Sequence, residues 1–178
     1  MKDDSKKVLG IFLRYIILIA VVIPGLALFY DLFLPLTKYP VLYILEIFFN
    51  PIVSGNTIFI GAKNLDIIGA CVAGSAYYLL LILNLSTPDI KLYKRVKMII
   101  LSFLIFLVVN IIRIVILGIM FVNNSSLFEL THEILWYAGS TILVVGIWFY
   151  EVVAFKIRSI PVYSDIKYIY GKSSLKKK

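Results

Sequence analysis

The sequence predicts an all-α integral membrane protein with about four transmembrane helices. Of its 178 residues, 61% are hydrophobic and only 16% are charged, and the mean hydropathy is +0.97. A soluble domain carries about 25% charged residues, so a soluble core could not absorb this apolar excess. The excess is also gathered into runs that can cross a hydrocarbon layer of about 30 Å. These observations exclude a soluble enzyme, and the single cysteine excludes an internal disulfide framework.

Four apolar runs account for the predicted helices, and each exceeds the roughly 18 residues that a crossing needs. They cover residues 8–34, 67–85, 98–122 and 134–155. In the first run, Pro24 predicts a kink, and Arg14 lies close enough to the end to extend its charged head to the lipid headgroups. This run is too long for a cleavable signal peptide, and no small-residue cleavage site follows it. We therefore expect it to form a transmembrane helix.

The positions of the lysines and arginines predict how the bundle is oriented. Fourteen of the 18 lie before the first run, between the second and third runs, or after the fourth. The opposite side holds only Lys38 and Lys63, both in the long segment 36–66. By the positive-inside rule, both termini face the cytoplasm of a multi-pass plasma-membrane protein. The net charge of +8 then reflects topology and anionic lipid headgroups, and no nucleic-acid partner is expected.

The outer segment 36–66 is predicted to contain two small elements. Residues 39–50 read as an interfacial helix that is too short to cross the membrane. Residues 57–60 and 65–68 read as the strands of a small β-hairpin around Gly61-Ala62-Lys63-Asn64, before the second transmembrane helix. We expect a single membrane-embedded domain over residues 1–160, followed by a basic cytoplasmic tail over residues 161–178.

Arg113 is the most unusual residue of the third run. A charge at the centre of a membrane costs ~2.5–3.5 kcal/mol, so the side chain requires a partner or a water-filled cavity. Counting outward from Lys97 at 1.5 Å per residue places Arg113 roughly 24 Å along the helix, in the outer third of the membrane. Asn110 lies one turn earlier, and we expect the two side chains to share a polar pocket. The alternative is a structural arginine that extends to the headgroups or caps neighbouring carbonyls.

Cys71 follows the predicted hairpin at the outer end of the second run. It lies in Gly69-Ala70-Cys71-Val72-Ala73-Gly74-Ser75, whose small residues leave room for the backbone of a substrate. A free cysteine in an apolar run is often only an inert small hydrophobe, and that interpretation stays open.

His132, the only histidine, precedes the apolar part of the fourth run on the same outer side. Ser126 and Glu129 match the capping-box pattern, which starts the helix near residue 127 and places His132 in its second turn. Glu129 and Trp136 would then lie beside the imidazole. A histidine near the surface commonly has no special role, so this residue also has an ordinary interpretation.

The predicted topology brings Cys71, Arg113 and His132 to the outer leaflet, although it was derived from the basic flanks alone. A thiol nucleophile, a guanidinium that can hold an oxyanion and an imidazole acid/base form a complete acyl-transfer set. One histidine and one cysteine without a dense carboxylate cluster give too few ligands for a metal. We expect neither a metal nor a cofactor.

At these residues the chain resembles the archaeosortase/exosortase family of membrane transpeptidases. The resemblance rests on Ala70-Cys71-Val72-Ala73-Gly74, on Asn110-Ile111-Ile112-Arg113-Ile114, and on His132 at the opening of the last helix, and it covers residues 54–150. Family members often place a glycine two residues after the cysteine, whereas Gly74 comes three after Cys71. Many members also carry additional helices that this chain lacks.

The resemblance implies a cysteine peptidase or transpeptidase that acts on the C-terminal sorting signals of surface proteins. Such a signal holds a recognition motif, a transmembrane helix and a basic tail. The enzyme would cut near the motif at the outer leaflet through a Cys71 thioester and pass the new C-terminus to an acceptor, for which a lipid is expected. Arg113 would stabilise the oxyanion and His132 would act as acid and base, with Asn110 and Glu129 in support.

Two interpretations from other classes stay open. In one, the chain is a non-enzymatic membrane subunit, such as a transporter component, in which Arg113 and Asn110 bind an anionic solute. In the other, it is an assembly scaffold in which all three residues are structural. Tolerance of the substitution Cys71→Ser separates both from a thiol enzyme.

Overall fold

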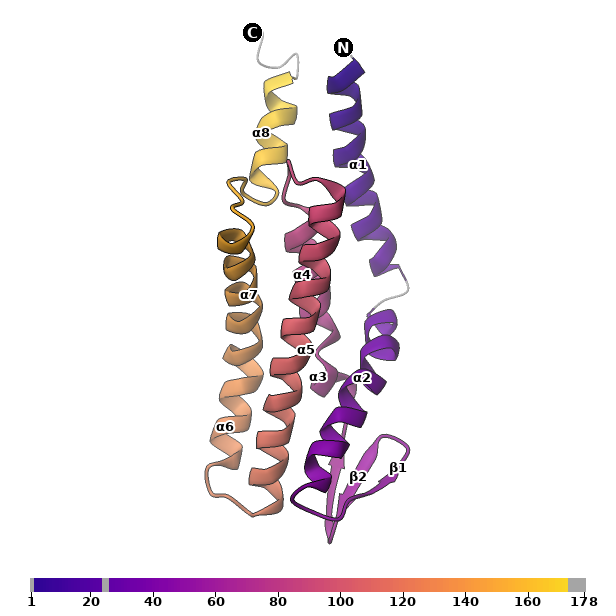
Figure 1. Cartoon of the computed structure of the whole chain (residues 1–178), viewed down its shortest axis with the longest axis vertical. Helices are drawn as coiled ribbons and strands as arrows, with labels where there is room; N and C mark the ends of the chain where they lie inside the picture. The colour runs from indigo at the N-terminus through magenta and orange to yellow at the C-terminus, as the bar shows by residue number, and fades with distance from the viewer. Residues whose placement is uncertain (1, 24–25, 173–178) are drawn as a thin grey trace.

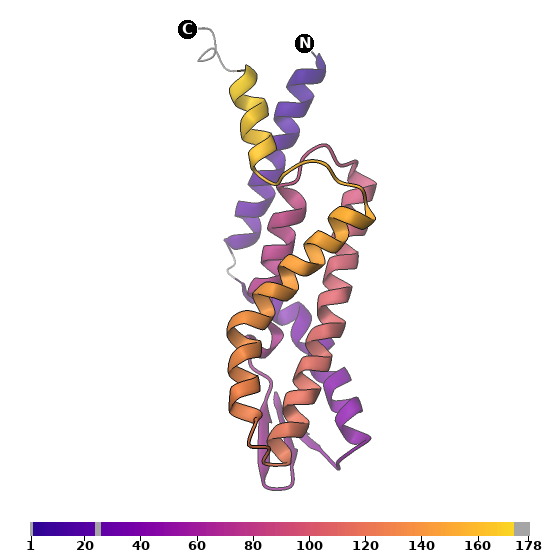
Figure 2. The same cartoon turned by 90° about the vertical axis from the view of Figure 1, so that its left-hand side faces the viewer.

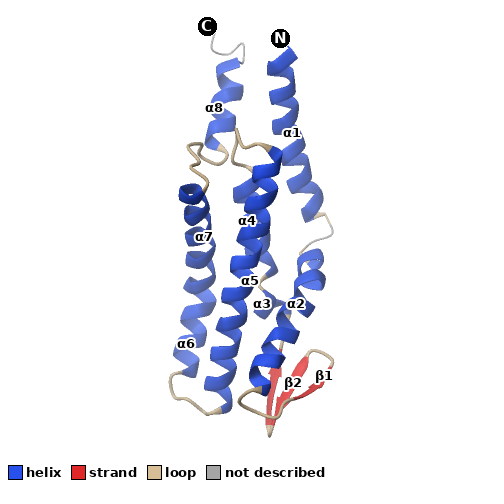
Figure 3. Ribbon diagram, viewed as in Figure 1, coloured by secondary structure: helices blue, strands red, loops and turns tan. Residues whose placement is uncertain are grey.

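The computed structural model describes residues 2–23 and 26–172 as an elongated helical bundle with a small sheet at one end (Figures 1 and 3). The sheet consists of β1 (Ile52–Ser54), β2 (Thr57–Ile60) and β3 (Lys63–Asp66). The helices are α1 (Lys2–Val22), α2 (Ala27–Glu46), α3 (Gly69–Val72), α4 (Gly74–Leu85), α5 (Leu92–Val122), α6 (Phe128–Ile134), the π-helical turn η1 (Leu135–Gly139), α7 (Ser140–Ala154) and α8 (Tyr163–Lys172).

Among the described residues, three helical segments are long and apolar enough to cross a membrane, which fits a membrane protein. They are Ala27–Glu46, Leu92–Val122 and the continuous segment Phe128–Ala154. The segment Gly69–Leu85 is apolar but shorter. The predicted helical architecture with a small β element before the second apolar run is thus confirmed, while the number of crossings stays a prediction.

The first apolar run is not the single helix that we predicted over residues 8–34. α1 ends at Val22, and α2 begins at Ala27 and continues to Glu46, through most of the predicted interfacial helix 39–50. Pro35 and Pro40 lie inside α2. Val41 and Leu45 are buried against the sheet and α5, and this packing holds the helix together beyond the prolines. Pro24, where we predicted a kink, lies outside the described residues.

The predicted hairpin is a three-stranded antiparallel meander in the order β1-β2-β3. Both turns contain two residues, and each begins with a glycine at positive φ (Gly55 and Gly61, both 59°), as tight hairpin turns require. The strand predicted at 57–60 is correct, but its partner begins at Lys63 rather than at residue 65, because Ile60 pairs with Lys63. Strand β1 was not anticipated.

Two hydrophobic clusters form the core, and α3 lies between them. The first joins α2, α4, α5 and α7, where Phe33 stacks on Tyr77 with ring centroids 3.6 Å apart. The second joins the sheet to α2 and α5 through Ile58 and Ile60. Val72 belongs to the first cluster, while the neighbouring Cys71 packs against the second. The short helix α3 is therefore held from both sides.

Both ends of the described chain lie at the end of the bundle that is farthest from the sheet (Figures 1 and 2). There, part of the predicted tail 161–178 forms α8, which is attached to α1 by a buried ion pair. Asp165 is 2% exposed and accepts hydrogen bonds of 2.8 and 3.0 Å from Arg14 Nη2. The expectation that Arg14 extends to the headgroups is wrong, since this carboxylate and two backbone carbonyls outside α1 bind its guanidinium.

Those carbonyls belong to the C-terminal end of α4, where helical carbonyls lack partners within the helix. Arg14 Nη1 donates to the carbonyls of Leu85 (3.1 Å) and Thr87 (3.0 Å). Arg95, which is 6% exposed, donates to the carbonyls of Asn84, Leu85 and Thr87. Two guanidinium groups from α1 and α5 thus close the end of α4.

The buried ion pair predicts a large loss of stability when one partner is removed. Asp165→Ala should lower the free energy of unfolding by about 3–5 kcal/mol, because it leaves the Arg14 charge without its carboxylate. The matched control is Asp89→Ala. Asp89 forms an exposed ion pair of 2.8 Å with Lys7, and this hydrogen bond raises the pKa of the Lys7 amine. Exposed pairs contribute about 0–1 kcal/mol. Denaturation in detergent measures both losses, and equal losses would contradict the prediction.

Candidate functional site

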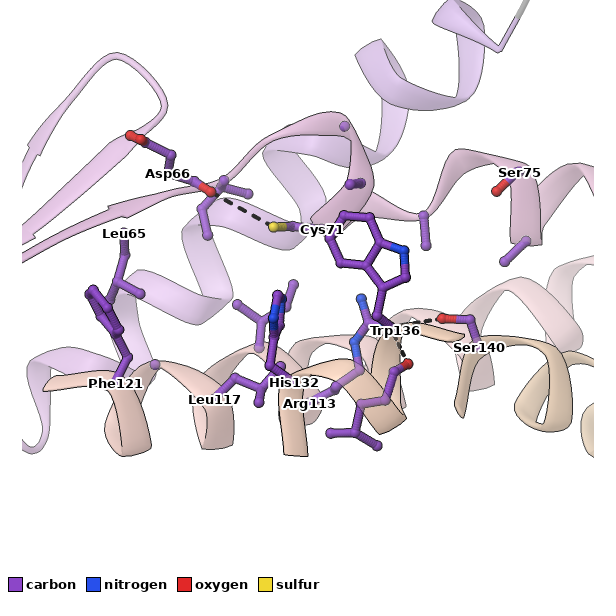
Figure 4. Close-up of a pocket in the computed structure, with 18 of the residues that line it drawn as sticks. Leu65, Asp66, Cys71, Ser75, Arg113, Leu117, Phe121, His132, Trp136 and Ser140 are labelled. Carbon is purple, nitrogen blue, oxygen red and sulfur yellow. Dashed lines mark hydrogen bonds between the residues drawn. The ribbon is translucent and has the colours of Figure 1, made fainter. Parts of the chain in front are cut away.

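A cavity of about 570 Å³ lies between α3 and α4 on one side and α5, α6, η1 and α7 on the other (Figure 4). Cys71, Arg113 and His132 all line it, each from a different helix. The structure therefore brings together the three side chains that the sequence singled out. Other polar residues in the lining include Asn64, Asp66, Ser75, Ser140 and Thr141.

Cys71 is half-buried and lies on the single turn of α3. Its Sγ donates a hydrogen bond to the carbonyl of Asp66, at 3.7 Å, as Figure 4 shows. The turn ends at Ala73, which is in the left-handed conformation with φ of 56°. Gly74 then lets α4 start against the ring of Tyr30, since a Cβ at Gly74 would lie 2.7 Å from Tyr30 Cε1. The small residues around Cys71 thus permit a close approach of α2, a role that we had not predicted.

Arg113 enters the cavity from α5 and is fixed by the helix on the other side. Its Nη1 donates to Ser140 Oγ at 2.8 Å and makes a longer contact of 3.5 Å with the carbonyl of Leu135. Leu135 is the first residue of the π-helical turn η1, and Ser140 follows its last residue. Such turns occur frequently at functional sites. The Arg113 Nε is buried and has no hydrogen-bond partner among the described residues. Ser140 was missed because a lone serine in an apolar run carries no distinctive signal.

We predicted that Asn110 and Arg113 share a polar pocket, and the structure shows that they do not. Its side chain is 1% exposed, and its Nδ2 donates to the carbonyl of Cys71 at 2.9 Å. Asn110 is not part of the cavity lining. Residues three apart on a helix differ by about 60° in direction, because each residue turns the helix by about 100°. That difference is enough for Asn110 to face α3 while Arg113 faces η1 and α7.

His132 is held between two aromatic rings. It stacks on Phe128 with centroids 5.5 Å apart and 7° between the planes, and it meets Trp136 edge-to-face at 5.6 Å. The predicted neighbour Trp136 is thus confirmed, while Glu129 is exposed and does not line the cavity. The predicted capping box is absent from α6. Leu127 is the N-cap residue without a side-chain cap, and its N–H donates to Ser125 Oγ at 3.4 Å instead.

This arrangement holds groups that acyl transfer can use. Around one cavity, the thiol can act as a nucleophile, the guanidinium can donate hydrogen bonds to an anion, and the imidazole can accept and release a proton. Within residues 2–23 and 26–172, no three His, Cys, Asp or Glu side chains gather closely enough to hold a metal ion.

Fold and site together define a helical protein with membrane-length helices and a thiol-bearing cavity near its sheet. Comparisons with protein-family models, with curated proteins and with solved structures find no match to this chain.

The cavity predicts that Cys71 distinguishes reagents by their charge. Arg113 is the only lysine or arginine in the cavity lining, and its guanidinium lies within electrostatic range of Cys71. Arg113→Gln should therefore lower the ratio of alkylation rates for iodoacetate over iodoacetamide several-fold. Both reagents require the same thiolate, so the ratio cancels any change in thiol ionisation.

Alkylation rates of the single cysteine in detergent measure this ratio. Lys63→Gln is the control, because Lys63 lies on β3 outside the cavity, where its amine donates to Asn124 Oδ1 at 2.7 Å. An unchanged ratio in Arg113→Gln, or an equal fall in Lys63→Gln, would show that Arg113 does not act on the thiol electrostatically.

Proposed function

We propose that the protein is a membrane-embedded cysteine transpeptidase of the archaeosortase/exosortase type. It cleaves the C-terminal sorting signals of surface proteins and transfers the new C-terminus to an acceptor, with a lipid amine as the expected nucleophile. The observation that carries this proposal is the shared cavity of Cys71, Arg113 and His132. Three helices that are distant in sequence each contribute one of the groups that acyl transfer needs.

In the first half-reaction, the Cys71 thiol gives its proton to His132, and the resulting thiolate attacks the scissile carbonyl carbon and forms a C–S bond. The carbonyl oxygen becomes an oxyanion, which the Arg113 guanidinium stabilises. Collapse of this intermediate breaks the C–N bond, and His132 protonates the leaving amine. The signal's transmembrane helix and basic tail leave with that amine. The remainder of the surface protein stays attached to Cys71 as a thioester.

In the second half-reaction, His132 accepts a proton from the incoming nucleophile, which attacks the thioester carbonyl. Collapse then breaks the C–S bond, and the expelled Cys71 sulfur takes the proton from His132, which restores the free enzyme. Transfer competes with hydrolysis, and the outcome depends on how well water is excluded from the thioester. Aromatic and aliphatic residues in the lining, among them Phe121, Leu117 and Trp136, favour transfer.

The proposal places the cavity at the outer face of the plasma membrane and both termini in the cytoplasm. The four crossings would be the α1–α2 pair, the α3–α4 segment, α5 and the continuous α6–α7 segment. Support comes from the basic residues in the first turns of α1 and α5, and from those that follow α7, because these elements lie at the end of the bundle away from the sheet (Figure 1). Anionic headgroups and the positive-inside rule favour the cytoplasm for such an end.

The proposed mechanism predicts a covalent intermediate on Cys71, which is the only thiol in the chain. Purified protein incubated with a substrate that carries a tripartite C-terminal signal should form an adduct on the Cys71 peptide. Hydroxylamine should remove it, because thioesters react readily with this nucleophile. Mass spectrometry with and without hydroxylamine detects the adduct.

Cys71→Ala is the matched control for this experiment. A small-for-small change at a half-buried position should leave the protein folded in the membrane, while cleavage is abolished. Complete cleavage of the substrate by Cys71→Ala would overturn the proposal. The interpretation as a transporter subunit or an assembly scaffold would then lead.

The proposed orientation has its own test, which does not depend on activity. In a Cys71→Ser background, single cysteines replace the exposed residues Asn123, in the α5–α6 connection, and Arg158, which follows α7. A membrane-impermeant maleimide should label Asn123→Cys in intact cells and should label Arg158→Cys only after permeabilisation. Labelling of Arg158→Cys in intact cells would contradict the orientation and place the cavity on the cytoplasmic side.

A further inference from the structure

We propose that Asn110 is a positioning residue, which fixes the turn that carries Cys71 and thereby sets the direction of the thiol. The kinetic part of this inference rests on the proposed transpeptidase function, whereas its structural part does not. The contact that carries it is the hydrogen bond from Asn110 Nδ2 to the carbonyl of Cys71, at 2.9 Å.

The turn that holds Cys71 has little stability of its own. α3 contains four residues, and its backbone bonds run from the N–H groups of Cys71 and Val72 to the carbonyl of Ile68 and from Ala73 to Gly69. A single helical turn is unfavourable in isolation, because it orders several residues for few hydrogen bonds. The left-handed conformation of Ala73 then interrupts the ladder that would lead from the Cys71 carbonyl into α4.

Asn110 provides that carbonyl with a partner from the longest helix of the bundle. α5 contains 31 residues and packs against α2, α4 and α7, so it is a rigid support. The Asn110 side chain is 1% exposed, and its Oδ1 is buried without a partner among the described residues. An amide that is buried for one hydrogen bond is a poor way to stabilise a bundle, since its unpaired oxygen opposes burial. The burial of this amide is better explained by the contact that it makes with the Cys71 carbonyl.

Cys71 is consequently held at two points. Asn110 fixes its carbonyl from α5, and the carbonyl of Asp66, at the end of β3, accepts the hydrogen bond from Sγ. The direction of the thiol relative to Arg113 then depends on both contacts. Displacement of a reacting group by about 1 Å can lower a rate by about 10²-fold. Loss of the Asn110 bond should therefore slow the attack of Cys71 on the bound sorting signal without weakening the binding of that signal.

Asn110→Leu tests this inference, and Asn84→Leu is its matched control. Asn84 is also a fully buried asparagine, and its Nδ2 donates to Glu151 Oε2 at 3.0 Å and to the carbonyl of Leu80, away from the cavity. The measurements are the iodoacetamide alkylation rate of Cys71, kcat and KM for signal processing, and the unfolding temperature in detergent. Asn110→Asp, which is similar in shape but lacks the Nδ2 donor, is measured in parallel in case the leucine variant does not accumulate.

For Asn110→Leu we expect alkylation to rise several-fold, because the turn no longer holds Sγ against the Asp66 carbonyl. The kcat should fall at least tenfold while KM stays within about twofold. Asn84→Leu should change the unfolding temperature without either effect. Unchanged alkylation and kcat in the Asn110 variants, or the same changes in Asn84→Leu, would overturn the inference. If the wild-type protein processes no signal, the proposed function fails, and the alkylation rates alone still decide whether Asn110 positions Cys71.

Discussion

The structure depends on the backbone carbonyls just before and at the end of α4, and on the side chains that bind them. In an apolar surrounding, backbone N–H and C=O groups must find partners within the protein. The segment Gly69–Leu85 is interrupted at Ala73, so carbonyls are left over both at the interruption and at the end of α4. Asn110 binds the carbonyl at the first place, while Arg14 and Arg95 bind the carbonyls at the second. These contacts set the positions of α1 and α5 around α4, and the link from Arg14 to Asp165 extends the arrangement to α8.

The sequence was sufficient for elements that rest on composition and insufficient for those that rest on tertiary contacts. Long apolar runs located α5 and the continuous helix from Phe128 to Ala154. Hydropathy placed the start of this run at residue 98, whereas α5 begins at Leu92. The charged residues Lys94 and Arg95 lower the hydropathy of the first turns, so these turns were not recognised as part of the helix. The continuation of α2 beyond Pro35 and Pro40 depends on the burial of Val41 and Leu45, which a single sequence does not reveal. The tail could not be recognised as α8, because it is attached through Asp165 to a residue about 150 positions earlier.

The same division applies to the cavity. Cys71, Arg113 and His132 could be singled out because a thiol, an intramembrane charge and a lone imidazole are rare in apolar runs, and all three line the cavity. Their surroundings could not be derived in this way. Ser140 and Tyr30 belong to common residue types, and their importance appears only from the 2.8 Å bond to Arg113 and from the contact with Gly74. Helical spacing correctly placed Trp136 beside His132, since both lie on one helix. It failed for Asn110, whose partner lies on another element.

The two arginines Arg95 and Arg113 of α5 differ in how their charges are compensated, and Arg95 is buried while Arg113 is half-buried. Arg95 donates to three carbonyls around the end of α4, so its charge is compensated by the helix terminus and its geometry is fixed. Arg113 makes one short bond, to a neutral serine hydroxyl, and its Nε is buried without a partner among the described residues. It also has no carboxylate partner there, and the cavity in front of it contains a thiol and an imidazole. A cation with a buried, unused donor is costly in an apolar surrounding unless an anion binds to it. The proposed transpeptidase reaction would supply such an anion, the tetrahedral oxyanion that forms where Cys71 attacks.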